Sequence, residues 1–227
     1  EPLIQFYGYK TCGVWNSAEE IAANPHFSDD APGGIRIVDT NNDGSLTPED
    51  RVALGTPYPD FTWGITNTFQ IKDFDISFLI QGVQGITVLN GDVYYNETKK
   101  WNKKYTKNRW VSAEHPGDGK TPYQNVKTGH DLMLTDYPLQ NASYACLRNF
   151  TVGYTLPATA ARKIKLSGVR FYVSGSNLLY IWGSGYKGIN PESRMTSGNY
   201  SSAMISGYQR GGFPLTSTIS AGFDINF

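Results

Sequence analysis

The chain has 227 residues, of which 39% are hydrophobic, 14% aromatic and 18% charged, and its 20 basic and 20 acidic residues cancel. A neutral chain gives no electrostatic argument for nucleic acid or for an anionic membrane surface as a partner, and the aromatic content argues against disorder. Cys12 and Cys146 lie far apart, and the three histidines are scattered, so neither a disulfide framework nor a zinc site is expected. No segment approaches the roughly 18 consecutive apolar residues of a membrane helix.

The first motif along the chain is a loop rich in Asp and Asn at residues 39–50. Its spacing fits the calcium-loop pattern D-x-[DN]-x-[DN]-G, which supplies oxygen ligands from positions one, three, five, seven and twelve. The candidate calcium ligands are Asp39, Asn41, Asp43, the carbonyl group of Ser45, and Asp50. Asp50 stands where the pattern has Glu, so its carboxylate reaches one methylene less far. The alternative is an Asx-rich turn held by its own hydrogen bonds.

Period-two alternation of apolar and polar residues, the pattern of a strand with one apolar face, recurs further along the chain. It predicts five strands, at about residues 58–71, 74–88, 143–156, 168–182 and 215–227. The last is the clearest, because Phe223, Ile225 and Phe227 alternate with Asp224 and Asn226. A strand of a soluble sandwich could show the same pattern, but the final aromatic residue resembles the C-terminal insertion signal of outer-membrane barrels.

The connections between these strands alternate in length. Those at 72–73 and 157–167 are short, whereas 89–142 and 183–214 are long and rich in Gly, Tyr, Asn and Ser. Bacterial barrels have short periplasmic turns and long extracellular loops, so the pattern favours an all-β, antiparallel membrane barrel. Five strands cannot close a barrel and would leave two exposed edges, so we expect a larger whole.

Several motifs resemble one family, the SusC/RagA-type TonB-dependent transporters of Bacteroidetes. The run from Ser143 to Pro157 (SYACLRNFTVGYTLP) is similar to a late-barrel signature of the family, and so is the run from Val169 to Leu178 (VRFYVSGSNL). The stretch from Asp39 to Phe61 and the segment Gln5–Lys10 (QFYGYK) also resemble family segments. The resemblance covers nearly the whole chain, in the family's order.

The resemblance implies a full protein of about 22 strands closed around an N-terminal plug. It implies import of oligosaccharides or peptides captured by a SusD-like surface lipoprotein, with energy from the TonB complex reached through an N-terminal part not contained here. Glu1 would then lie inside a longer polypeptide. Residues 1–57 would form an extracellular loop region with the calcium loop, and residues 58–227 the C-terminal five strands of the barrel with the long loops.

Aromatic residues in the two long loops are candidate contacts for the solute or the lipoprotein. They are Tyr94, Tyr95, Trp101 and Trp110 in the first loop, and Tyr186, Tyr200 and Tyr208 in the second. Tyr and Trp combine apolar area with a polar group, which suits sugar stacking or lid packing. The alternative is that they pack on one another and order the loops.

Four aromatic residues near predicted strand ends are candidates for the aromatic belts of a membrane barrel, although strand propensity alone also accounts for them. They are Trp63, Tyr154, Tyr172 and Trp182. We find no catalytic constellation and expect no enzyme. The remaining alternative is a soluble, calcium-stabilised β-sandwich that binds carbohydrate, in which the apolar strand faces would be buried against each other.

Overall fold

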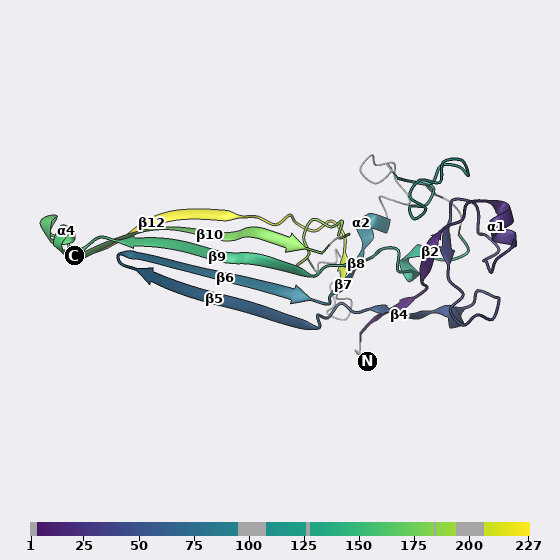
Figure 1. The fold of residues 1–227 in the computed structure, drawn as a ribbon, viewed down its shortest axis with the longest axis horizontal. Coiled ribbons are helices and arrows are strands. Elements are labelled where there is room, and N and C mark those ends of the chain that lie inside the picture. Colours follow the sequence, from purple (N-terminus) through teal and green to yellow (C-terminus); the bar gives the residue numbers. More distant parts are fainter. Residues whose placement is uncertain (1–3, 95–107, 126–127, 184, 194–206) are drawn as a thin grey trace. The chain divides into compact units, whose positions relative to one another are not determined.

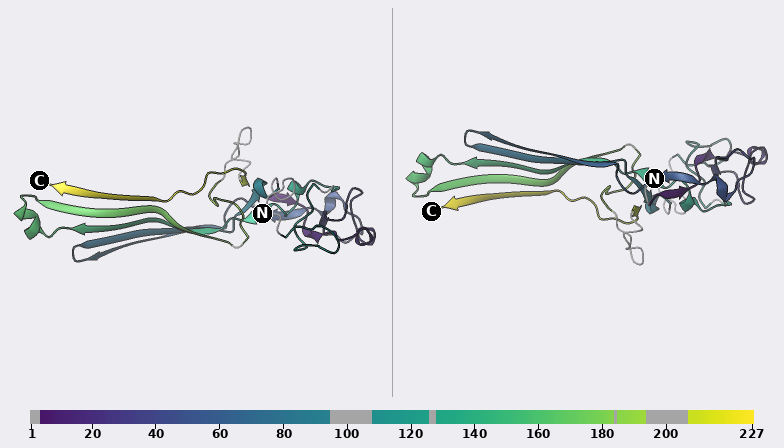
Figure 2. Two further views of the ribbon diagram at one scale, coloured as in Figure 1. Left: turned by 90° about the horizontal axis from the view of Figure 1, so that it is seen from above. Right: turned by 90° about the horizontal axis from the view of Figure 1, so that it is seen from below.

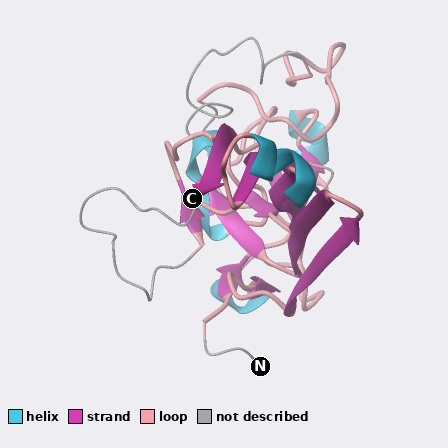
Figure 3. Cartoon of the chain, turned by 90° about the vertical axis from the view of Figure 1, so that its left-hand side faces the viewer, coloured by secondary structure: helices cyan, strands magenta, loops and turns pink. Residues whose placement is uncertain are grey.

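The structure is a computed structural model that describes residues 4–94, 108–125, 128–183, 185–193 and 207–227. Its segments group into two compact units that alternate along the chain. Unit 1 comprises Glu1–Tyr58, Ile86–Asn141 and Glu192–Gly212, and unit 2 comprises Pro59–Gly85, Ala142–Pro191 and Phe213–Phe227. Strands dominate and helices are short (Figure 3). None of the helices in the described ranges is both long and apolar enough to span a bilayer.

Unit 2 is one antiparallel sheet whose strands run side by side in a single layer (Figures 1 and 2). The strand order is β12-β10-β9-β6-β5. The bounds are β5 Phe61–Ile71, β6 Phe74–Gln84, β9 Tyr144–Thr155, β10 Gly168–Trp182 and β12 Thr218–Asn226. The five predicted strands are therefore confirmed, in an order that links neighbours along the chain.

The predicted bounds of three strands were too long. The first strand begins at Phe61 rather than 58. The second strand ends at Gln84 rather than 88, because Gly85 takes a left-handed φ of 77° that interrupts the ladder. The residues beyond it, Thr87–Asn90, form β7 in another sheet. The last strand begins at Thr218 rather than 215.

The register of unit 2 sorts its side chains onto two faces. Phe171 lies opposite Phe223 on one side and Tyr154 on the other, whereas the next residue, Tyr172, lies between Gly222 and Gly153. Because alternate residues of a strand point to opposite sides, these rows define an apolar face and a polar face. The apolar face includes Phe69, Ile71, Phe74, Ile76, Phe150, Val152, Tyr154, Phe171, Val173, Ile219, Phe223 and Ile225. The polar face includes Asp75, Ser77, Thr151, Arg170, Tyr172, Ser174 and Asp224.

Irregular register interrupts the sheet at one level. The shifts fall between Leu79 and Ile80 on β6 and between Ser176 and Leu179 on β10, with Arg148 as the extra residue on β9. Asn177, in the β10 irregularity, has a left-handed φ of 56°. Pairing of β10 with β12 stops at Ser176, below the shift. A bulge of this kind re-aims side chains, and here it brings Arg148 onto the polar face.

Unit 1 consists of small sheets and single helical turns. Its sheets are β1 (Phe6–Gly8) with β4 (Val52–Gly55), β2 (Thr11–Val14) with β3 (Ile35–Ile37), and β11 (Tyr208–Gln209) with β7 and β8 (Leu139–Asn141). Its helical turns are α1 (Ala18–Ala22), η1 (Pro48–Asp50), α2 (Gly91–Val93) and η3 (Leu132–Leu134), while α4 (Ala158–Lys163) belongs to unit 2. Both predicted long loops thus contribute strands to unit 1.

The core of unit 1 joins the N-terminal segment to the first long loop. Tyr9, Ile35, Ile37 and Leu132 are buried together. Beside them the Asp136 carboxylate accepts hydrogen bonds from the Thr11 amide at 3.0 Å and the Thr11 hydroxyl at 2.6 Å. Contacts of such long sequence separation hold Leu132 and Asp136 of the long loop against the N-terminal segment.

Candidate functional site

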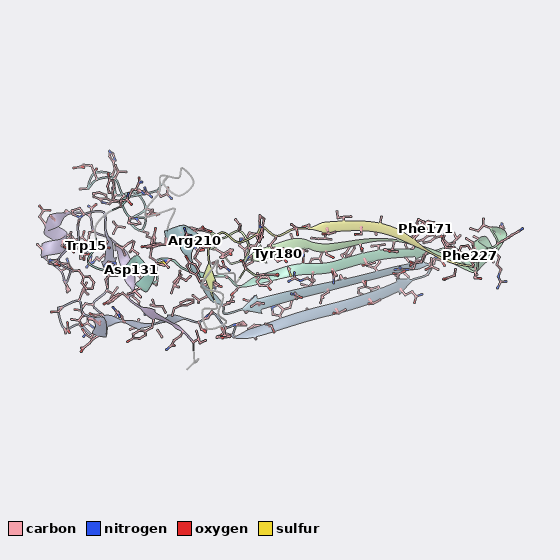
Figure 4. The ribbon with its side chains drawn as sticks, turned by 180° about the vertical axis from the view of Figure 1, so that it is seen from behind. Trp15, Asp131, Phe171, Tyr180, Arg210 and Phe227 are labelled. Carbon is pink, nitrogen blue, oxygen red and sulfur yellow. The ribbon has the colours of Figure 1, made fainter. Side chains whose placement is uncertain are left out.

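The apolar face of unit 2 is exposed. Phe171 is 51%, Phe223 65% and Phe227 94% exposed, and the described residues place no opposing sheet over them. In a β-sandwich these side chains would be buried against a second sheet. A contiguous apolar surface of this extent marks contact with another protein or with lipid. Figure 4 shows Phe171 and Phe227 toward the end of the sheet that carries α4, and Tyr180 toward the other end.

The polar face carries an ion-pair cluster that crosses three strand boundaries. Arg170 donates from Nε to Asp75 Oδ1 at 3.1 Å and from Nη2 to Asp75 Oδ2 at 2.6 Å. Its Nη1 reaches Asp224 Oδ2 at 3.5 Å. Asp75 is on β6, Arg170 on β10 and Asp224 on β12, so the guanidinium spans the intervening strand β9. The cluster ties the last strand to the rest of the sheet.

A second cluster lies at the level of the irregular register. Arg148 Nη1 donates to Asn177 Oδ1 at 2.7 Å and to the Tyr180 hydroxyl at 2.8 Å. With its amide turned so that oxygen faces the guanidinium, Gln81 accepts from Nε and Nη2 of the same arginine. The alternation pattern alone could not find Arg148, because the bulge decides its face. The sequence does place two acids, Asp75 and Asp224, and the basic Arg170 at polar positions of the alternating strands. This pattern could have predicted an ion pair.

We expect Gly153→Ala to destabilise the sheet by about 1–3 kcal/mol, the usual cost of overpacking. Gly153 lies beneath the ion pair on β9, and a Cβ there would overlap the Asp75 carboxylate and the Arg170 guanidinium. The measurement is the urea midpoint of the full-length protein folded into phospholipid vesicles. Gly64→Ala is the matched control, since its Cβ would meet no atom closer than 3.9 Å. Equal midpoints for the two variants would contradict the prediction.

The loop at residues 39–50 is closed by side-chain to backbone hydrogen bonds. Asp39 Oδ2 accepts from the Gly44 amide at 2.8 Å, Asn41 Oδ1 from the Asp43 amide at 3.0 Å, and Asp43 Oδ1 from the Ser45 amide at 2.8 Å. These are the contacts of an Asx-rich turn. They also orient the oxygen-bearing side chains of the predicted calcium ligands.

Asp50 is the buried anchor of this loop, with 0% of its surface exposed. Its Oδ1 accepts from the Thr40 amide and its Oδ2 from the Thr47 amide, both at 2.8 Å. Burial raises the pKa of the Asp50 carboxyl, but the hydrogen bonds from Thr47, Thr40 and Asn41 outweigh it, so the pKa lies below its usual value. Asp50 is therefore a carboxylate at neutral pH.

One observation tests whether the loop fits a cation. Asp39 Oδ1 is buried and accepts no hydrogen bond from the described residues, although a buried carboxylate oxygen normally has a partner. Within the same residues no group of three or more Asp, Glu, His or Cys side chains is arranged to hold a metal. The three carboxylates of the predicted set, Asp39, Asp43 and Asp50, are therefore not gathered into a metal-binding group in this structure. The orphaned oxygen leaves the loop compatible with calcium.

The described loop aromatics are largely packed. Trp110 is buried, donates from Nε1 to Asn16 Oδ1 at 3.0 Å and meets the Tyr123 ring edge-on. Tyr186 is buried and packs edge-on against Trp182. Tyr94 packs against the unit 1 core, and Tyr208 is half-buried in β11 next to Gly91. Tyr95, Trp101 and Tyr200 lie outside the described residues. The contact roles of these aromatic residues stay predictions.

Of the four aromatic residues predicted to form belts, two lie on the apolar face and two on the polar face. Trp63 and Tyr154 have the parity of the apolar face, since Trp63 lies opposite Gly82 and Tyr154 opposite Phe74. Tyr172 and Trp182 have the parity of the polar face, and Tyr172 lies under the Arg170 guanidinium, 5.3 Å from its ring centroid. The belt prediction is wrong for these two residues, because their strand positions turn them away from the apolar surface.

Comparisons of sequence identify similar proteins although no family model matches the chain. Over its whole length the chain is 31% identical to the TonB-dependent receptor P26 and 30% identical to the TonB-dependent receptor P3, both of Formosa agariphila. Over 69% of its length it is 27% identical to the TonB-dependent receptor SusC of Bacteroides thetaiotaomicron. The chain spans 23%, 22% and 15% of these relatives.

Comparison of structures gives the same fold. The RagAB peptide transporter superposes on 98% of the chain with a TM-score of 0.71 at 18% sequence identity, and the chain covers 22% of that structure. The RagAB peptide importer in its open-open state gives a TM-score of 0.65 at 18% identity over the same share of this chain.

Proposed function

We propose that unit 2 forms part of the wall of a solute importer. The premise is that this chain belongs to the TonB-dependent receptors of the SusC/RagA type, which are outer-membrane proteins. The observation that carries the proposal is the division of one sheet into an exposed apolar face and a polar face with fixed arginines. In a membrane barrel the first face contacts lipid and the second lines the lumen.

The proposed cargo is an oligosaccharide or a peptide, delivered with a SusD-like surface lipoprotein and moved with energy from the TonB complex. The similarity to the RagAB peptide transporter supports a peptide as cargo, and the similarity to the TonB-dependent receptor SusC supports TonB-dependent uptake. The two long loops would lie at the outer mouth, where such a lipoprotein would dock. The short connections of unit 2 would then face the periplasm.

The test of this function is an uptake assay with the full-length protein in its own bacterium. Cells lacking the gene should lose uptake of either labelled oligosaccharides or labelled peptides, and the lipoprotein should co-purify with the protein in detergent. Extraction of the protein without detergent would instead support the soluble sandwich, as would uptake that is unchanged by the deletion.

We also propose that calcium binds the loop at residues 39–50 and stiffens it. The support is the ligand spacing and the buried Oδ1 of Asp39, which has no hydrogen-bond partner among the described residues. The ligands would be Asp39, Asn41, Asp43, the Ser45 carbonyl group and Asp50. Calcium takes several such oxygens at about 2.3–2.6 Å.

Calcium removal should loosen this loop alone. We expect a chelator to accelerate hydrogen exchange at residues 39–50 about tenfold in the full-length protein, with no change in the strands of unit 2. The estimate corresponds to roughly 1.4 kcal/mol of lost local stability. Asp43→Ala should remove the chelator effect, because the exposed Asp43 is a proposed ligand, and the hydrogen bonds that its carboxylate accepts from Asn41 Nδ2 and the Ser45 amide are lost with and without calcium alike. Identical exchange with and without calcium would contradict the site.

A further inference from the structure

Cationic residues gather at one end of the sheet of unit 2. Two short connections lie there, the Lys72–Asp73 turn between β5 and β6 and residues 156–167 between β9 and β10 (Figure 1). The Thr155 amide donates to the Asp73 carbonyl at 2.8 Å, so the second connection begins beside the turn. Together the connections carry four exposed cations, namely Lys72, Arg162, Lys163 and Lys165.

The four cations outnumber the acids of the two connections. In the described part of the chain none of them forms an ion pair. The nearby carboxylates of Asp75 and Asp224 are both held by Arg170. Asp73 is the remaining acid of the two connections. The neutral charge of the whole chain therefore conceals a basic cluster at this end.

Two of the lysines occupy backbone positions that disfavour them. Lys72 has a φ of 56° and Lys165 a φ of 60°, in the left-handed region where Gly or Asn is strongly preferred. Such outliers cost stability and point to a function for the side chain. A structural role alone would be served better by Gly or Asn.

Apolar side chains accompany the cations. Ile164, between Lys163 and Lys165, is 57% exposed, and the two residues that flank the first turn, Ile71 and Phe74, are exposed on the apolar face. Long basic side chains can bury their stems along an apolar surface and extend their charge into the adjoining polar layer. The arrangement matches the boundary between hydrocarbon and headgroups.

We propose that Lys72, Arg162, Lys163 and Lys165 form a binding site for the phosphate groups of anionic phospholipids. The inference rests on the proposed function, because it requires the apolar face to contact lipid. Basic clusters of this size beside a membrane-embedded segment bind anionic headgroups. The site would fix the short-turn end of the sheet at the membrane surface.

The test is native mass spectrometry of the full-length protein released from detergent in the presence of phosphatidylglycerol or phosphatidylcholine. The wild type should retain phosphatidylglycerol and little phosphatidylcholine. The combined variant Lys72→Asn, Arg162→Gln, Lys163→Gln and Lys165→Asn should reduce retention at least tenfold, since each charge contributes roughly fivefold. The matched control is Lys10→Gln with Lys120→Gln, two exposed lysines of unit 1. Equal loss in control and combined variant would overturn the site.

Single variants separate charge from backbone strain. Lys72→Asn and Lys165→Asn should lower phosphatidylglycerol retention while the urea midpoint stays constant or rises, and Lys72→Arg should keep retention. Equal retention of both lipids, or displacement of phosphatidylglycerol by millimolar inorganic phosphate, would overturn a lipid site. A protein that stays soluble without detergent would instead refute the proposed function itself, so the two failures are distinguishable.

Discussion

Val173→Arg is expected to destabilise the membrane-inserted protein by about 2–4 kcal/mol, whereas Ser174→Arg is expected to cost less than about 1 kcal/mol. The two residues are neighbours near the middle of β10, and they have opposite parity in the sheet. Val173 is 53% exposed on the apolar face, so its replacement would carry a charge into hydrocarbon. Ser174 lies between Thr151 and Ser220 on the polar face, where water solvates an added charge.

The comparison is informative because both sites are partly exposed in the sheet as described. In a soluble protein an added arginine at either site would be a surface substitution, with an effect of about 0.5 kcal/mol or less. A large difference between the two sites requires a solvent other than water on one side. The measurement is the free energy of unfolding from urea titration of the full-length protein in phospholipid vesicles.

A third substitution on the same strand tests how the cost of a charge depends on depth in the membrane. Ile181 has the parity of the apolar face and lies near the end of β10 toward the long loops. The cost of a charge falls to about 0–1 kcal/mol near the membrane surface, so Ile181→Arg should cost much less than Val173→Arg. A greater cost at Ser174 than at Val173 would reverse the assignment of the faces. Equal small costs at all three sites would rule out a membrane wall.

The alternation of the sequence predicted the strands of unit 2 because a one-sided environment imposes a local period of two. The same parity placed Tyr172 with Arg170 and Ser174 rather than with Phe171. Its assignment to an aromatic belt followed residue type and ignored that parity. The face on which a strand residue lies is set by its position in the alternation, and strand propensity carries no information about it.

The position of Arg148 could not be predicted from the sequence. It depends on two register shifts at one level of the sheet, and each is decided by pairing between different strands. Parity counted along β9 from Phe150 would put Arg148 on the apolar face. Only the irregular register brings it to the polar face, where it contacts Gln81, Asn177 and Tyr180. The ion pair of Arg170 could be predicted more readily from the sequence, because the pairing of β10 with β12 is regular from Gly168 to Ser176.

Unit 1 was the least predictable part of the fold. Its strands are two to four residues long, too short for an alternating pattern, and Tyr208–Gln209 pairs in parallel with β7 across more than a hundred residues. The sequence showed only long segments rich in turn residues. What it did indicate was the loop at residues 39–50, whose spacing is a local property and whose hydrogen bonds are local as well.

Asp50→Ala is expected to lower the local stability of this loop by about 3 kcal/mol, even in the absence of calcium. The substitution removes the acceptor of the Thr40 and Thr47 amides, and a buried donor left unpaired costs about 1–3 kcal/mol. Hydrogen exchange at these two amides in the full-length protein should accelerate about 100-fold. Asp43→Ala, at an exposed position of the same loop, should leave their exchange unchanged in chelator.

The same contacts fix the pH dependence. The pKa of Asp50 is lower in the folded loop than in the unfolded chain, so folding favours the ionised carboxylate. Its contribution to stability is therefore fully present above the unfolded value, about 3.9 for Asp, and is lost as the pH falls through the folded value. Exchange at Thr47 should thus accelerate in the wild type below about pH 4. The Asp50→Ala variant should show no such acceleration. If the variant accelerates below about pH 4 as the wild type does, another group is responsible for the titration.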